Sequence, residues 1–300
     1  MKYGGLKYEN SGNLGDEIQS LAGEQFLPRV DKRFHRDRSS QAHDAHQHKY
    51  LTIMNGWYSH HPETALVASE TIDPVYVSVH ISPKAVPAIL CAKNIEFFRN
   101  HQPIGCRDQK TTDEFRKRGI DAYSSKCLTI TFPKRDSEPS HGKVFVVDAP
   151  HVRLPRGMRA DAVCITHRTN DVYGDMKFDL ARRLLDAYRD QARLVVTTRL
   201  HCALPCTAMG IPVIYFCDPS DYRIAVAGEI GLTLYEDPRL DKGSMKWKRR
   251  VLPRGAFRYL SVRNVDWDPE PVDIEHHKEK LIADVKNRIE SKLRLDAAAA

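Results

Sequence analysis

Short apolar runs alternate with amphipathic stretches along most of this chain. Runs typical of buried strands lie at residues 50–54, 75–81, 103–106, 120–123, 127–131, 144–148, 162–166, 194–196 and 212–216. Spacing typical of helices occurs at residues 16–26, 84–100 with a break at Pro87, 111–118, 176–189, the stretch before Gly210, 218–231 and 274–293. Strands and helices that alternate in this way indicate an α/β fold with doubly wound, mainly parallel sheets.

This α/β pattern occurs twice, and the segment between the two halves has the composition of a linker. Pro133–Gly142 is charged and carries proline, serine and glycine. We therefore predict two Rossmann-like domains that face a cleft, a GT-B-like arrangement, over residues 1–135 and 143–270. A helix over residues 271–295 is expected to pack back on the N-terminal domain. Residues 296–300 are interpreted as a vector-derived tail.

Residues 194–216 form the unit around which the C-terminal half is organised. They predict two parallel strands joined by a helix, with Thr197–His201 at the carboxyl end of the first strand, where open α/β sheets bind ligands. Pro205 has no amide to donate to the carbonyl of His201, so the helix begins near the proline or bends there. The freed amides could then meet an anion. The alternative is structural: Arg199 forms a salt bridge and His201 caps the helix.

A second polar loop precedes the helix that is expected to begin near Asp16. Glu9–Asp16 is rich in glycine and small polar residues, and such a loop at a helix start can hold an anion or a sugar by its amides. The loop is not a Gly-x-Gly-x-x-Gly sequence, and no Walker lysine follows it. The alternative is an ordinary turn in which Asp16 is the N-cap.

The predicted cleft collects polar side chains from the loops and strand ends of both halves. These candidates are Asn13, Gly15, Asp16, Asn55, His80 and Arg107 from the first half, and His167, Arg168, Arg199, Leu200 and His201 from the second.

Composition is that of a soluble globular protein with enough chain for two cores. The chain has 300 residues, of which 41% are hydrophobic and 28% charged. No apolar stretch approaches the roughly 18 to 20 residues that span a bilayer, and the first residues lack the apolar core of a signal peptide. We therefore expect a cytoplasmic protein. The seven cysteines are odd in number and mostly embedded in apolar runs, which favours reduced thiols.

The net charge of +7 suggests anionic partners, but the basic residues are scattered. No aromatic and basic platform is present, so nucleic acid is not an expected partner. Lys246–Arg250 either faces membrane phosphates or an anionic acceptor at the inner face of a membrane, or is a solvated loop. The histidine-rich tract His43–His48 is interpreted as a loop rather than a metal site, and Cys202 with Cys206 lacks the second pair that zinc requires.

Five motifs resemble, in order along the chain, those of the polysaccharide pyruvyltransferase family. They are Asn13-Leu14-Gly15-Asp16 with Gln19-Ser20-Leu21-Ala22, Met54-Asn55-Gly56-Trp57, Pro103-Ile104-Gly105-Cys106-Arg107-Asp108, Cys127-Leu128-Thr129, and Thr198-Arg199-Leu200-His201-Cys202-Ala203-Leu204-Pro205. The resemblance covers residues 3–217. Lys126 and Ile130 depart from the family pattern around the fourth motif and bear on the identity of the acceptor.

The resemblance implies a bacterial enzyme of exopolysaccharide or capsule biosynthesis. Such an enzyme transfers the pyruvyl group of phosphoenolpyruvate to hydroxyls of a sugar, in a glycan or a lipid-linked precursor, and forms a cyclic ketal. It implies that the Arg-Leu-His motif, here Arg199, Leu200 and His201, binds phosphoenolpyruvate. No cofactor or metal is expected beyond this co-substrate.

The chemistry suggests a role for several candidates. Arg199 with Arg168 would pair with the two anionic groups of phosphoenolpyruvate. His201 would protonate the enol carbon or stabilise phosphate, and Asp16 would accept the hydroxyl proton or hold the acceptor, with His80 and His167 in reserve. Two other functions stay open: a GT-B glycosyltransferase that uses a nucleotide sugar, and a non-catalytic protein that binds anionic glycans.

Overall fold

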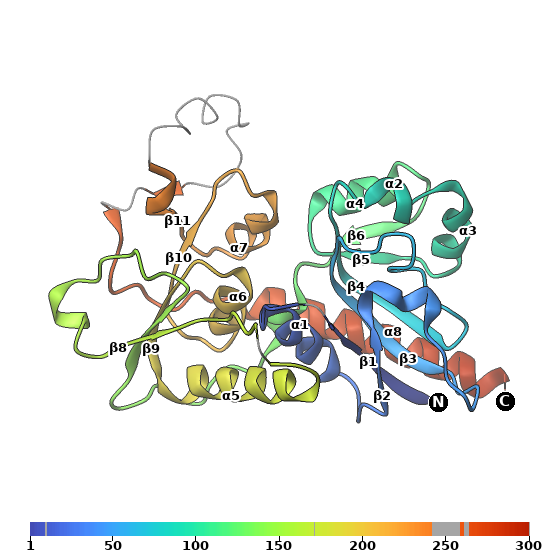
Figure 1. Cartoon of the computed structure of the whole chain (residues 1–300), viewed down its shortest axis with the longest axis horizontal. Coiled ribbons are helices and arrows are strands. Elements are labelled where there is room, and N and C mark those ends of the chain that lie inside the picture. The colour runs from blue at the N-terminus through green and yellow to red at the C-terminus, as the bar shows by residue number, and fades with distance from the viewer. Residues whose placement is uncertain (10, 171, 242–258, 261–263, 300) are drawn as a thin grey trace.

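The protein is described by a computed structural model that covers residues 1–9, 11–170, 172–241, 259–260 and 264–299. It contains two parallel sheets, each with helices around it, which lie side by side in Figure 1. The predicted fold of two Rossmann-like domains is confirmed. The basic cluster at residues 246–250 lies outside the described residues.

The first lobe holds a sheet of strand order β2-β1-β3-β4-β5-β6. Its elements are β1 (Lys2–Lys7), α1 (Gly15–Glu24), β2 (Lys32–His35), η1 (Arg36–Gln41), β3 (Tyr50–Tyr58), β4 (Ile72–Ile81), α2 (Val86–Ile89), α3 (Ala92–Asn100), β5 (Ile104–Cys106), α4 (Gln109–Arg116), β6 (Ala122–Ser124) and η2 (Leu128–Thr131). The strand order reverses beside β1, so the crevice at the carboxyl ends of β1 and β3 is the expected ligand site of this lobe.

The second lobe has the equivalent order, β12-β11-β10-β9-β7-β8. Its elements are β7 (Lys143–Val147), η3 (Arg156–Met158), β8 (Ala162–Ile165), α5 (Asp175–Gln191), β9 (Ala192–Thr197), α6 (Leu200–Ala208), β10 (Val213–Cys217), η4 (Tyr222–Ile224), α7 (Ala225–Glu229), β11 (Leu234–Glu236), η5 (Pro238–Asp241), β12 (Tyr259–Leu260) and α8 (Glu275–Ala299). Here the order reverses beside β7, and the loops after β7 and β9 border the crevice.

Four predicted elements differ from the structure. The helix expected over residues 218–231 is a 3₁₀ turn, η4, followed by the short helix α7. Residues 127–131 were expected to form a strand, but η2 is a 3₁₀ helix that packs on α1 and α6. The corner expected at Asn55–Tyr58 belongs to β3, which continues through an irregularity after Met54. The break expected at Pro87 falls after α2, because proline occupies the first turn of that helix, where its missing amide costs no hydrogen bond.

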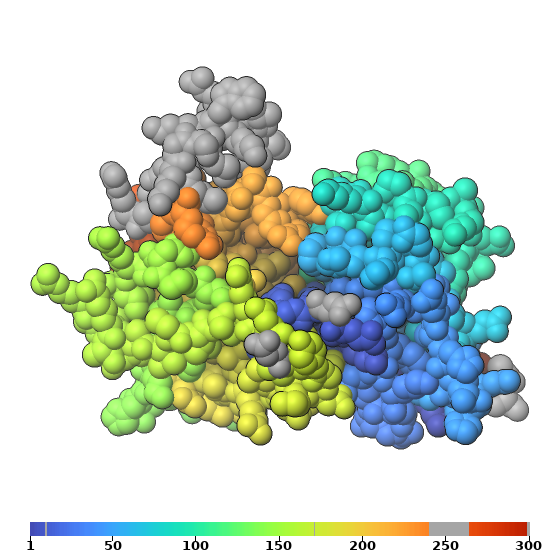
Figure 2. All heavy atoms as spheres, viewed as in Figure 1, coloured from blue at the N-terminus to red at the C-terminus, as the bar shows by residue number. Residues whose placement is uncertain are grey.

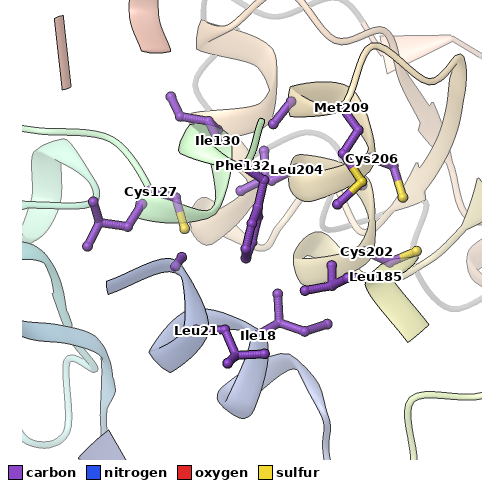
Figure 3. Close-up of a cluster of buried hydrophobic side chains, with 14 of the residues drawn as sticks. Ile18, Leu21, Cys127, Ile130, Phe132, Leu185, Cys202, Leu204, Cys206 and Met209 are labelled. Carbon is purple, nitrogen blue, oxygen red and sulfur yellow. The ribbon is translucent and has the colours of Figure 1, made fainter. Parts of the chain in front are cut away.

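One hydrophobic cluster extends through both lobes. Figure 3 shows Ile18 and Leu21 of α1 beside Phe132 of the connecting segment and Leu185 of α5. The cluster continues into α6, β9 and β10, and α8 contributes Ile289 to it. A core shared in this way ties the two sheets into one packed unit.

The terminal helix α8 follows the second lobe in sequence but packs along the first lobe. Lys292 of α8 forms an ion pair with Asp73 of β4 at 2.6 Å, and Arg288 donates to the carbonyl of Pro103 at 2.7 Å. The helix continues through Ala299, within the part interpreted as a tail. Within the described ranges, no helix is long and apolar enough to span a membrane.

Candidate functional site

The two lobes interlock at the loops that border both crevices. Asn13 forms an antiparallel bridge with Arg168, and the amide of Leu14 donates to the carbonyl of His167 at 2.9 Å. Lys177 of α5 reaches across to Glu17 of α1 at 2.6 Å, a pair that is almost completely buried. In Figure 2 the dark blue start of the chain lies against the yellow-green loop of the second lobe. The cleft above this junction is therefore held by contacts from both sides.

The cleft has a volume of about 250 Å³ and is lined from both lobes. Its lining residues are Asn13, Gly15, Asp16, Gln19, Trp57, Arg107, His167, Thr198, Arg199, Leu200, His201, Tyr215, Asp221, Arg223 and Ile224. Most of the sequence-predicted site residues are thus brought together at one place.

Arg107 is the most buried cation of the cleft, with 2% of its surface exposed. Its guanidinium donates to Gln19 Oε1 at 3.2 Å and contacts His201 Nε2 at 3.3 Å. Its Nε has no hydrogen-bond partner, and no carboxylate within the described residues forms an ion pair with it. A buried guanidinium whose hydrogen-bond partners are neutral side chains is suited to receive an anion.

Arg199 is held at the second crevice by a residue that sequence reasoning missed. Its Nε donates to Asp148 Oδ2 at 2.7 Å, and Asp148 also accepts from Thr166 and from the amide of His167. Burial opposes ionisation of Asp148, but these three hydrogen bonds hold its pKa below the usual value. The ion pair that the structural alternative predicted is therefore present. Because only Nε is engaged, the outer nitrogens of Arg199 can face the cleft.

His201 lies in the distorted first turn of α6, as the proline argument predicted. Its backbone (φ −83°, ψ 19°) departs from helical values, and Arg199 rather than His201 is the N-cap residue. Burial, followed by the positive charges of Arg107 and Arg223, holds the pKa of His201 well below its ordinary value. The ring is therefore neutral at pH 7, with Nε2 accepting from Arg107.

Gly15 allows α1 to approach His201. A Cβ built on Gly15 would lie 3.2 Å from His201 Cβ and 3.2 Å from the Asn13 side chain. The N-terminus of α1 can therefore lie directly beside the imidazole.

Asp16 is in the first turn of α1, and the N-cap position belongs to Leu14, so the N-cap alternative is wrong. Its carboxylate accepts from the Ser11 hydroxyl and from Arg36 at 3.3 Å. It is 7% exposed and still lines the cleft.

Arg223 is a cation of the cleft that was not among the sequence-predicted site residues. It lies after β10 in η4, and Asp221 accepts from its Nε at 2.8 Å and from Nη2 at 2.6 Å. The guanidinium stands 5.3 Å from the ring centre of Trp57 in the opposite lobe. The only sequence signal was its place after a buried strand, where Asp221 and Arg223 occur together.

A second pocket adjoins the cleft and shares part of its wall. Arg168 lines this pocket together with Arg199 and Asp148, but Arg168 is not among the residues lining the main cleft. Arg199 and Arg168, the expected donor pair, thus lie together in the second pocket, whereas the main cleft combines Arg199 with Arg107 and Arg223.

Two candidates lie outside both pockets. Asn55 is 2% exposed and donates from Nδ2 to the carbonyl of Gln19 at 2.7 Å, which fixes α1 on β3. His80 is fully buried, and its Nδ1 lies 2.5 Å from Asp108 Oδ2.

Two further candidates line the cleft but also have structural contacts. His167 lines the cleft, but its Nε2 is engaged with the Tyr188 hydroxyl at 2.9 Å. Leu200 lines the cleft and also packs against the shared core.

No group of three or more metal-ligating side chains is found in the part of the chain that the structure describes. The seven cysteines are free thiols, and all but Cys91 and Cys164 are buried.

Comparison with known proteins identifies one family. A family profile described as polysaccharide pyruvyl transferase matches residues 13–218, the span that contains most of the cleft. No curated protein matches the sequence. Among solved structures, a functionally uncharacterised protein from Klebsiella pneumoniae subsp. pneumoniae NTUH-K2044 aligns with 12% identity and a TM-score of 0.42, over 76% of this chain and 88% of that one.

Proposed function

The chain belongs to the polysaccharide pyruvyl transferase family, and from this premise we propose that it transfers the pyruvyl group of phosphoenolpyruvate to two hydroxyls of a sugar. The product is a cyclic pyruvate ketal on a glycan or a lipid-linked precursor, and phosphate is released.

The observation that carries the proposal is the buried guanidinium of Arg107. Taking a charge out of water without a counter-ion is costly, so a ligand of opposite charge is the natural partner. Arg199 and Arg223 line the same cleft, and each already has one carboxylate. Phosphoenolpyruvate carries a phosphate and a carboxylate, and planar guanidinium groups bind both in bidentate fashion.

Ketal formation sets the other requirements of the site. A proton adds to the methylene carbon of the enol, a sugar hydroxyl bonds to the resulting cationic carbon, and the second hydroxyl displaces phosphate. The hydroxyls lose two protons: one balances the proton gained at carbon, and the other leaves with the phosphate as hydrogen phosphate. The site therefore needs an acid, a base and cations that stabilise the leaving phosphate.

His201 and Asp16 are the proposed acid and base. Burial and the nearby guanidinium groups keep His201 neutral, and a bound dianion beside it would favour its protonated form, which could then donate to carbon or phosphate. Asp16 faces the cleft from the opposite lobe, where it could accept a hydroxyl proton or hold the acceptor. Arg36 and Ser11 fix its carboxylate in one orientation.

The experiment measures phosphate release from phosphoenolpyruvate with a panel of glycan acceptors, together with detection of the ketal product. Arg107→Gln is expected to abolish release, whereas Arg294→Gln, at an 82% exposed site on α8, should behave as wild type. Asp16→Asn should lower the rate strongly and leave donor binding intact. Wild-type turnover by Arg107→Gln would refute the assignment.

A further inference from the structure

The segment that carries Arg223 is fastened to the opposite lobe by contacts that the proposed reaction does not use. The Tyr222 ring packs against His80 of β4 at an angle of 37°, with ring centres 5.5 Å apart, and its hydroxyl lies 3.4 Å from His80 Nε2. Lys110 of α4 stands 4.5 Å from the Tyr222 ring centre. Together with the stacking of Arg223 on Trp57, these contacts join the second lobe to the first across the cleft.

Asp108 holds the His80 ring in one orientation. Its Nδ1 is 2.5 Å from Asp108 Oδ2, and Asp108 is the N-cap of α4, accepting from the Thr111 amide at 2.9 Å and from its hydroxyl at 3.0 Å. A carboxylate only accepts, so Nδ1 carries the hydrogen. In the neutral ring Nε2 is then an acceptor, and the Tyr222 hydroxyl is the donor to it.

This arrangement bears directly on Arg223. Asp221 accepts hydrogen bonds from the guanidinium, and Trp57 of the opposite lobe lies near it. The position of Arg223 therefore depends on where its sequence neighbour Tyr222 is docked. Tyr222 itself is not among the residues that line the cleft. Burial raises the pKa of Tyr222 to about 12, so the hydroxyl stays protonated and is unsuited to act as a base.

We propose that Asp108, His80 and Tyr222 are positioning residues that fix Arg223 in the donor cleft, so that the second lobe's cation meets the anion bound by Arg107. The chain of hydrogen bonds runs from the N-terminus of α4 through His80 to Tyr222, across the two lobes. This inference rests on the proposed function only in naming phosphoenolpyruvate as the anion.

The first test is a double-mutant cycle on phosphoenolpyruvate affinity, measured by calorimetry. Tyr222→Phe keeps the ring and removes one hydrogen bond, so we expect the Kd to rise about fivefold. Arg223→Gln should raise it more. If Tyr222 acts through Arg223, the double variant should match Arg223→Gln alone. Independent, additive losses, or no loss in Tyr222→Phe, would overturn the proposal. Tyr3→Phe, on β1 and away from the cleft, is the matched control.

The second test needs no donor. Backbone hydrogen exchange of residues 218–224 should quicken in Tyr222→Phe and stay unchanged in Tyr3→Phe. Unchanged exchange in Tyr222→Phe would refute the docking role. If wild type binds no phosphoenolpyruvate but the exchange result holds, the proposed donor is wrong and the positioning of Arg223 stands.

Discussion

At the residue scale, the cleft contains two kinds of arginine. Two form ion pairs with carboxylates, and a third forms none within the described residues. Arg199 and Arg223 have Asp148 and Asp221 as partners, whereas Arg107 has neutral partners within the described residues. Sequence reasoning found Arg107 and Arg199 because both follow strands. It missed Asp148, whose hydrogen bonds join it to residues 18 to 51 positions away. It also missed Arg223, whose contact with Trp57 depends on how the two lobes pack.

The burial of His80 predicts how the free energy of unfolding depends on pH. Burial, with the charge of Arg107 next, lowers the pKa of His80 to about 4 in the folded protein. In the unfolded chain it is about 6.5. The unfolded state therefore binds a proton that the folded state does not as pH falls from about 6.5 to about 4, and stability is lost over that range.

The measurement is urea unfolding of wild type and His80→Asn at pH 7.5 and pH 5. The asparagine variant lacks this titration, so the stability advantage of wild type should shrink by about 2 kcal/mol at pH 5. An advantage that is the same at both pH values would contradict the neutral, buried state of His80.

At the element scale, the strand-helix-strand unit around Arg199 could be predicted almost completely. The apolar runs predicted β9 and β10, and Pro205 predicted the distorted backbone at His201. The prediction failed at η2, where an apolar run looks like a strand but packs between α1 and α6 with no neighbouring strand to pair with. Periodicity alone cannot separate these outcomes in so short a segment.

Gly15→Ala tests how closely α1 must approach α6. Alanine favours the helix by up to about 1 kcal/mol, but its Cβ would press on His201 and Asn13. We therefore expect phosphate release to fall at least tenfold, while the free energy of unfolding changes by less than about 1 kcal/mol. Gly157→Ala, where no atom lies within 4 Å of the added Cβ, is the control. Full activity in Gly15→Ala would show that this approach is not required.

At the scale of the whole molecule, two Rossmann-like lobes were predictable from the repeated α/β pattern, but their shared core was not. The cluster that joins α1, α5, α6 and α8 depends on how the lobes pack, which periodicity within each lobe does not encode. Nor did the sequence reveal the buried pair of Glu17 and Lys177 across the junction.

Lys177→Met should destabilise the protein by about 3 to 5 kcal/mol, because it leaves the Glu17 carboxylate buried without its cation. The double variant Glu17→Leu with Lys177→Met removes both charges and should recover much of that loss. Chemical unfolding of the three proteins measures the difference. A Lys177→Met variant as stable as wild type would show that the junction does not depend on this pair.

The most direct test of an anion site at Arg107 is a calorimetric titration of the whole protein with phosphoenolpyruvate. We expect one site per chain in wild type, and no measurable binding in Arg107→Gln with its fold retained. Equal binding by both proteins would contradict a donor site at Arg107, as would saturable binding of a nucleoside diphosphate with none of phosphoenolpyruvate.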